Sequence, residues 1–258
     1  MFGFGKKRQK KLEDLSMHKG VGLITAYAPK SHISEQFRTL RTNIQYSNAD
    51  QQIKTLVFTS SGPAEGKSTI SANVAVTFAN QGLRTLLVDA DTRRPTVHAT
   101  FSLLNERGLV NLLTSKEDLD LGEYIVPTSV EHLSVLPTGP VPPNPSELLS
   151  SKRMERLINT LSKNFDMVIF DVPPLGSVTD AQILASKVDA TVLVVPFGIA
   201  QKGAVIAGKG LLEQVDANII GVVQNRVPQE ATGYYGYYGY YGNYGYYGKK
   251  DKDDKAAK

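Results

Sequence analysis

The sequence predicts an α/β domain with a mostly parallel sheet and helices on both of its faces. Short apolar runs recur along the chain without the polar–apolar alternation of a half-exposed strand. Helical patterns separate these runs, and strand–helix–strand order at this spacing favours right-handed crossovers between parallel strands. A Gly-Lys-Ser triplet follows the first run and opens a helix, at the end of the strands where such sheets bind ligands.

The individual elements follow from these patterns in chain order. Apolar runs bounded by turn residues predict strands at 54–59, 84–89, 133–136, 167–171, 191–195 and 219–224. Helical periodicity predicts helices at 68–81, 151–163, 179–187 and 201–215. The proline-rich segment 139–149 predicts a rigid turn followed by the start of a helix.

Composition divides the chain into three parts: a flexible basic arm at 1–30, the folded domain at 31–228, and a disordered tyrosine-rich tail at 229–258. Residues 1–11 hold five basic and no acidic side chains, and the last ten residues sum to +2. Because the whole chain carries +4, the remainder carries −3, which argues against a nucleic-acid partner. The basic start is either a solvated end or an electrostatic contact with anionic lipid or a protein.

Two further absences narrow the function. The chain has no cysteine, which excludes disulfides, thiolate metal sites and a cysteine nucleophile. No apolar stretch approaches the roughly 18 residues of a spanning helix, so we expect that the protein does not cross a membrane by itself.

Residues 60–69 (SSGPAEGKST) predict a phosphate-binding loop between the first strand and its helix. Backbone N–H groups and the helix N-terminus would face an anion, Lys67 would reach the β- and γ-phosphates, and the Ser68 hydroxyl would ligate Mg²⁺. Ser61 stands where the G-x-x-x-x-G-K-S pattern has its first glycine, and Gly62 follows it. The loop therefore needs a different backbone path, and a chance Gly-Lys-Ser at a strand–helix turn is the alternative.

Carboxylates end two later strands. Asp89 ends the 84–89 run and Asp91 follows two residues later, and alternation places them on the same side of the extended chain. Asp171 closes the 167–171 run, where Pro173 stops the strand. Asp-x-Asp alone is as typical of a turn as of a catalytic pair, but anion- and metal-facing groups at three strand tips of one sheet indicate a magnesium–nucleotide site.

These motifs, in this order and before a tyrosine-rich tail, resemble those of the bacterial tyrosine kinases (BY-kinases) of capsule and exopolysaccharide systems. The chain is similar to the separate cytoplasmic kinase polypeptide, from about residue 25 to the C-terminus. The resemblance implies a P-loop NTPase fold with Walker A, A′ and B motifs, and ATP and Mg²⁺ as cofactors. It implies catalytic roles for Lys67, Asp89, Asp91 and Asp171, with Asp89 as the base, and metal binding by Ser68, Asp89, Asp91 and Asp171. It implies nucleotide binding by Ser61, Gly62, Glu65, Gly66, Lys67, Ser68, Thr69 and Asn225.

The resemblance also implies partners. Glu35, Arg38 and Arg41 match the family's E-x-x-R-x-x-R subunit-contact motif and would assemble the chain into a homo-oligomeric ring; on spacing alone they would form a salt-bridged helix surface. A transmembrane activator, or polysaccharide co-polymerase, would recruit the cytoplasmic protein to the inner face of the membrane. A protein-tyrosine phosphatase would reverse its phosphorylation.

The tail is the implied substrate, phosphorylated in trans within the ring, and each phosphate would add about −1.5 to −2 charges. A sticky aromatic segment is the alternative. The expected phosphosites are Tyr234, Tyr235, Tyr237, Tyr238, Tyr240, Tyr241, Tyr244, Tyr246 and Tyr247.

Other functions remain open on the sequence. The chief competitor is a positioning or partition ATPase of the same P-loop class, but those proteins carry a signature lysine where this chain has Gly62. A third possibility is a non-catalytic module that binds nucleotide only as an assembly switch.

Overall fold

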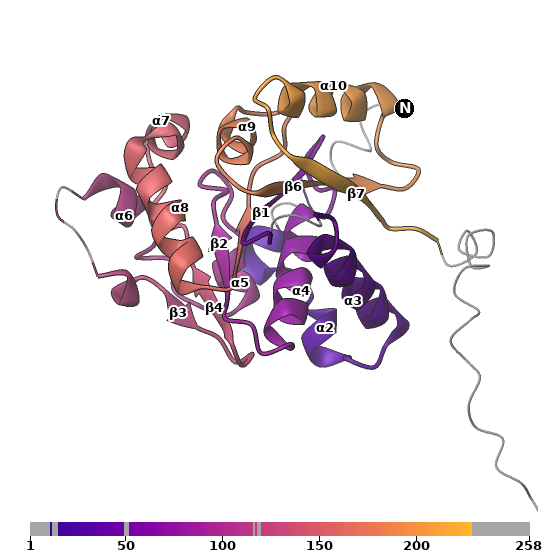
Figure 1. Ribbon diagram of the computed structural model, residues 1–258, viewed down its shortest axis with the longest axis horizontal. Coiled ribbons are helices and arrows are strands. Elements are labelled where there is room, and N and C mark those ends of the chain that lie inside the picture. The colour runs from indigo at the N-terminus through magenta and orange to yellow at the C-terminus, as the bar shows by residue number, and fades with distance from the viewer. Residues whose placement is uncertain (1–10, 12–14, 49–51, 116, 118–119, 229–258) are drawn as a thin grey trace, which may run out of the picture. The chain divides into compact units, whose positions relative to one another are not determined.

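A computed structural model describes residues 11, 15–48, 52–115, 117 and 120–228 (Figure 1). Contacts divide the chain into one unit at Met1–Asn225 and a second at Arg226–Lys258, of which residues 226–228 are described. The predicted α/β architecture is confirmed in the first unit. Along the described part of the chain no helix is both long and apolar enough to cross a membrane.

The first unit is built on a seven-stranded sheet in the order β3-β4-β2-β5-β1-β6-β7. All neighbouring strands are parallel except β3 and β4. Every residue of the central strands β1, β2 and β5 is buried, which explains their unbroken apolar runs. The strands are β1 Thr55–Ser60, β2 Thr85–Asp89, β3 Val126–Pro127, β4 Leu133–Leu136, β5 Met167–Asp171, β6 Ala190–Pro196 and β7 Ile219–Asn225.

The helices form two layers, one on each face of the sheet (Figure 1). Neighbouring strand residues point to opposite faces, so Val57 packs in the core cluster of α6–α10 while Leu56 packs in that of α2–α5. The helices are α2 Ile24–Tyr27, α3 His32–Gln45, α4 Lys67–Ala79, α5 Val97–Thr100, α6 Leu109–Thr114, the 3₁₀ turn η1 Leu121–Glu123, α7 Pro145–Ser150, α8 Lys152–Asn164, α9 Asp180–Ala185 and α10 Lys202–Glu213.

Helix α4 is the most enclosed of the helices described. Every residue from Ile70 to Ala79 is buried, because α2 and α3 cover the side that the sheet leaves free. Most of these ten residues are apolar, and the polar ones, Ser71, Asn73 and Thr77, donate hydrogen bonds to backbone carbonyls, so the helix can be buried on all sides. The phosphate-loop helix therefore has a fixed position relative to the sheet.

The predicted boundary of the flexible arm at residue 30 is wrong, because the folded domain begins before it. Leu23 and Thr25 are buried, and α2 packs on α4 and α3. The sequence misled because residues 20–28 have no helical period and form only one turn. Residues 1–10 and 12–14, with most of the arm's basic side chains, lie outside the described residues.

Candidate active site

The motifs meet at the carboxyl ends of the three central strands. In the sheet register Asp89 of β2 lies directly beside Asp171 of β5, which in turn lies beside Phe58 of β1. The loop that follows β1 connects it to α4. Three segments far apart in the sequence thus present their ends to one site, as expected for a parallel sheet.

The phosphate loop takes a path that its unusual sequence dictates. Ser61 donates its hydroxyl to the carboxylate of Glu65, with oxygen–oxygen distances of 3.0 and 3.1 Å, and Ser60 donates to the Gly62 carbonyl at 2.8 Å. Ala64 has a left-handed φ of 57°, a conformation that favours glycine. The loop lacks the first glycine of the usual pattern. Its path is fixed instead by the hydrogen bonds of two serine side chains and by the left-handed conformation of Ala64.

Gly66, at the N-cap of α4, is required by its backbone conformation, and any larger residue would also displace a neighbouring side chain. Its φ is +99°, and a Cβ there would lie 2.0 Å from the Asn225 side-chain nitrogen. Asn225, at the end of β7, donates that N–H to the Glu65 carbonyl at 3.0 Å. Asn225, which is expected to bind the nucleotide, thus contacts the phosphate loop.

Lys67 is the centre of charge in the site. Its Nζ lies 3.0 Å from Asp91 Oδ2, 3.5 Å from Asp171 Oδ1 and 3.3 Å from the Ser68 hydroxyl. Burial alone would lower the pKa of Lys67, but Asp171 and Asp91 more than offset this and raise it. The ammonium group is therefore charged at neutral pH and can bind an anion such as a phosphate.

Asp89 and Asp171 are completely buried; Asp89 Oδ1 accepts no hydrogen bond, whereas Asp171 Oδ1 lies 3.5 Å from the Lys67 ammonium. Asp89 Oδ2 accepts the N–H groups of Thr96 and Val97 at 3.0 and 2.9 Å, which leaves Oδ1 free. Burial, followed by the nearby Asp171, raises the pKa of Asp89 to about 8. Burial also raises the pKa of Asp171, against the opposing charge of Lys67. A buried carboxylate oxygen without a donor, such as Asp89 Oδ1, indicates a missing cation or hydroxyl partner.

The carboxylates fit Mg²⁺ only in part. Asp91 is already occupied, because it pairs with Lys67 and accepts the Arg94 N–H at 3.1 Å. Among the residues described, no three acidic or histidine side chains form a ready-made metal cage. Mg²⁺ in nucleotide sites, however, takes one or two protein ligands and completes its shell with phosphate and water. The Asp171 carboxylate and the nearby Ser68 hydroxyl suit that kind of binding.

The predicted interface residues on α3 have partners within the chain. Glu35 and Arg38 form an ion pair, and Arg41 donates to the Thr77 carbonyl of α4 at 3.1 Å. Thr69 of the loop motif lies in the first turn of α4, where its carbonyl accepts from Asn73 at 2.9 Å. The nine tail tyrosines lie outside the described residues.

Two polar clusters near the site were missed. Asp180, fully buried, accepts from Ser146 at 2.6 Å and from Arg93 at 2.9 Å. No sequence pattern points to this pairing, because its members come from three separate segments. Asn73 is different, since a polar residue inside the apolar run of α4 was a visible signal.

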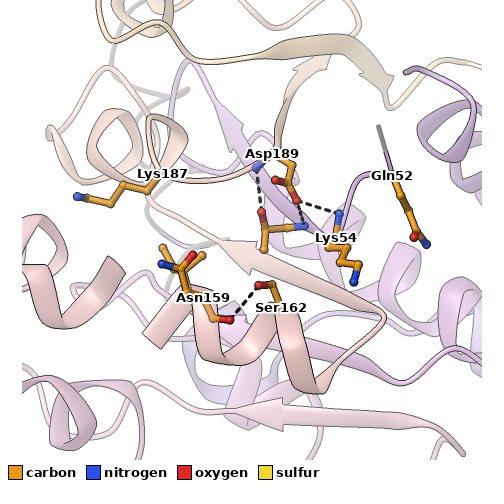
Figure 2. A pocket seen from close by; sticks show the side chains of 8 residues that line it. Gln52, Lys54, Asn159, Ser162, Lys187 and Asp189 are labelled. Atoms are coloured by element: carbon orange, nitrogen blue, oxygen red, sulfur yellow. Dashed lines mark hydrogen bonds between the residues drawn. The ribbon is translucent and has the colours of Figure 1, made fainter. Parts of the chain in front are cut away.

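A hollow of about 340 Å³ lies at the other end of the strands (Figure 2). It is lined in part by Lys54, Asn159, Lys187 and Asp189. Asp189 accepts the backbone N–H groups of Lys54 and Thr55 at 2.9 and 2.8 Å and so fixes the start of β1. This hollow opens away from the carboxylates and is separate from the candidate site.

Comparison with known proteins places these features in a family. Residues 53–219 match the family described as AAA domain. The chain is 45% identical over 203 residues to the tyrosine-protein kinase YwqD of Bacillus subtilis (strain 168), covering 79% of this chain and 85% of the relative. It is 45% identical over 207 residues to the putative tyrosine-protein kinase CapB of Staphylococcus aureus, covering 80% and 90%.

Solved structures agree with this placement. The chimerical protein CapA2B2 is 41% identical, with a TM-score of 0.77 over 84% of this chain and 99% of its own. The kinase domain of the Escherichia coli tyrosine kinase ETK is 32% identical, with a TM-score of 0.77 over 83% of each chain. The cell division protein MinD of Aquifex aeolicus is 25% identical, with a TM-score of 0.57 over 70% of this chain and 72% of its own.

Proposed function

This chain belongs to the bacterial tyrosine kinases, and from that premise we propose that it transfers the terminal phosphoryl group of ATP to tyrosine hydroxyls of its own tail. The observation that carries the proposal is the buried Lys67, which lies between Asp91 and Asp171. On the strand next to that of Asp171, Asp89 has a carboxylate oxygen, Oδ1, that accepts no hydrogen bond. Such a site combines an anion-binding cation with a buried carboxyl group that could exchange a proton with a substrate.

The residues divide the work of phosphoryl transfer. The loop amides and Lys67 hold the phosphates, and Ser68 and Asp171 are the side chains that would hold Mg²⁺. The metal, when bound, neutralises charge on the β- and γ-phosphates. Asp91 orients Lys67, and Asp89 faces the site with Oδ1 while two backbone amides fix Oδ2.

Asp89 is the proposed base once it has lost the proton that its pKa of about 8 leaves on it in the nucleotide-free protein, and the positive charge of a bound Mg²⁺ would favour that loss. A tyrosine oxygen bonds to the γ-phosphorus as the bond from that phosphorus to the β–γ bridging oxygen breaks, ADP leaves, and the phenolic proton passes to Asp89 Oδ1. The burial of Asp89 and Asp171 keeps water from their carboxyl groups. The reaction needs positioning and charge, so no nucleophile from the domain is required.

The acceptors would be the tail tyrosines of a neighbouring copy. Nine tyrosines lie at 234–247 in a segment of glycine and tyrosine with one asparagine, which suits entry into another subunit's site. Copies would join into a ring through Glu35, Arg38 and Arg41. Arg41 would either leave its contact with the Thr77 carbonyl to bind a neighbouring copy, or keep that contact while Glu35 and Arg38 bind the neighbour. Phosphorylation would loosen the ring by charge repulsion, and a tyrosine phosphatase would restore it.

A membrane-anchored activator would bring the protein to the inner face of the membrane, where it would regulate capsule or exopolysaccharide chain length. Support comes from the family resemblance and from similarity to the chimerical protein CapA2B2. The alternative of an assembly-switch ATPase draws on the similarity to MinD. It predicts nucleotide-dependent association without phosphotyrosine.

The test is phosphotyrosine formation on the full chain with Mg²⁺-ATP, with and without the cytoplasmic segment of the activator. Lys67→Met should abolish labelling, because the phosphates lose their cation. Lys54→Met is the matched control, since Lys54 is an exposed lysine at the opposite end of β1, and it should label as the parent does. ATP-driven assembly with no phosphotyrosine in any arm would favour the switch instead.

A further inference from the structure

Residues 20–25, here called the strap, contact both helices that present groups to the site. One end of the strap lies on α5, and its other end, which forms the start of α2, lies on α4; Figure 1 labels these three helices. Neither contact uses a residue of the phosphate loop or of the carboxylate motifs. The strap therefore needs an explanation of its own.

The first branch leads to the catalytic base. The Val21 N–H donates to the Thr100 hydroxyl at 3.0 Å, and that hydroxyl donates to the Thr96 carbonyl at 2.9 Å. Thr96 and Val97 are the residues whose N–H groups hold Asp89 Oδ2. Two hydrogen bonds thus separate the strap from the turn that orients the Asp89 carboxylate.

Gly20 makes this branch rigid. Its φ is +69°, and a Cβ there would lie 2.3 Å from Thr100 Cα and 2.4 Å from Thr100 N. The strap backbone therefore lies directly against the backbone of α5, where a side chain has no room.

The second branch leads to the phosphate helix. Asn73, fully buried in α4, accepts from the Thr25 N–H at 3.0 Å and from the Thr25 hydroxyl at 2.9 Å. Its amide nitrogen donates to the Gly22 carbonyl at 2.8 Å and to the Thr69 carbonyl at 2.9 Å. Thr69 follows Ser68, so Asn73 links the strap to the turn of α4 that carries Lys67 and Ser68.

We propose that the strap is a positioning element for phosphoryl transfer, with Thr100 setting the orientation of Asp89 and Thr25, through Asn73, setting the first turn of the phosphate helix. This inference rests on the proposed kinase function. The residues act through others and do not touch the substrate. The two branches should consequently affect different kinetic constants, because one ends at the base and the other at the phosphates.

The experiment uses the full chain with the activator segment and Mg²⁺-ATP. Thr100→Val should lower kcat about tenfold with KM for ATP nearly unchanged, and Thr25→Val should raise KM for ATP severalfold with a smaller effect on kcat. Thr100→Ser and Thr25→Ser, which keep the hydroxyl, should restore the parent values. Rates are expressed per folded molecule, with the folded fraction measured by circular dichroism at the assay temperature.

Thr114→Val is the matched control, because the Thr114 hydroxyl donates to the Val110 carbonyl at 2.8 Å in the same helical geometry and has no contact with the strap. Amide hydrogen exchange gives a second readout that needs no activity. The Thr96 and Val97 amides should exchange about tenfold faster in Thr100→Val and at the parent rate in Thr114→Val.

Parent-like kcat and parent-like exchange in Thr100→Val would overturn the strap inference. So would equal losses in Thr100→Val and Thr114→Val. A parent protein that forms no phosphotyrosine would overturn the proposed function instead, and the exchange data would then decide the strap by themselves.

Discussion

Replacing Asp89 by asparagine should make the nucleotide-free protein more stable while abolishing transfer. The asparagine oxygen can still accept the Thr96 and Val97 amides, and its nitrogen takes the place of Oδ1, which has no partner beside Asp171. The substitution therefore keeps every hydrogen bond of Asp89 and removes one buried acid from a group of three around a single lysine.

The magnitude follows from the pKa of Asp89, which rises from 3.8 in the free residue to about 8 in the fold. Between these values the folded protein holds a proton that the unfolded chain releases, so stability falls as pH rises from about 4 to about 8. At pH 7 this costs up to about 4 kcal/mol, from ~1.4 kcal/mol for each pKa unit. Allowing for water penetration, we expect Asp89→Asn to gain about 2 kcal/mol, or roughly 4–8 °C in Tm.

The assay is thermal unfolding in EDTA at pH 5 and at pH 8. The advantage of Asp89→Asn should grow between the two, because the wild-type penalty grows with pH. Asp120→Asn, at an exposed aspartate, supplies the baseline and should change Tm little. If the Tm of Asp89→Asn is at or below that of the parent at pH 8, or exceeds it by the same amount at both pH values, then the raised pKa of Asp89 is wrong.

Three further substitutions test the loop and its surroundings. Gly66→Ala should weaken nucleotide binding more than tenfold in calorimetric titration, since its Cβ would collide with Asn225; Gly203→Ala, whose Cβ would meet nothing within 4 Å, should bind normally. Ala64→Gly should raise Tm by about 1–2 °C by relieving the left-handed φ of 57°, and an unchanged or lower Tm would contradict the strain. Asp180→Ala should cost about 2–3 kcal/mol in urea unfolding because it leaves Ser146 and Arg93 without their acceptor; a loss below 0.5 kcal/mol would show that water replaces the carboxylate.

Much of the sheet was predictable because its central strands are buried on both faces. The run at 167–171 matches β5 to the residue, the run at 84–89 begins one residue before β2, and the run at 54–59 is shifted by one residue from β1. Strand β3 was missed, since two residues with a proline carry no period. Short helices such as α5 were missed for the same reason.

The site was predictable only as a set of residue types. Sequence order placed Lys67, Asp89 and Asp171 at strand ends, and the register of β2 and β5 brought the two aspartates side by side. The pairing of Asp91 with Lys67 was not predictable, because it depends on where the chain turns after β2. The contacts of Asn73 with the strap join segments about fifty residues apart, which no local pattern encodes.

The enclosure of α4 has a consequence for how a nucleotide is received. Because ten consecutive residues of this helix are packed on every side, it has no neighbouring space into which it can slide or tilt. The triphosphate must therefore bind to a helix whose position is already fixed. Any opening and closing of the site during turnover has to be made by the loops around that helix. Regulation by another molecule would then act on the loops that surround the site rather than on α4.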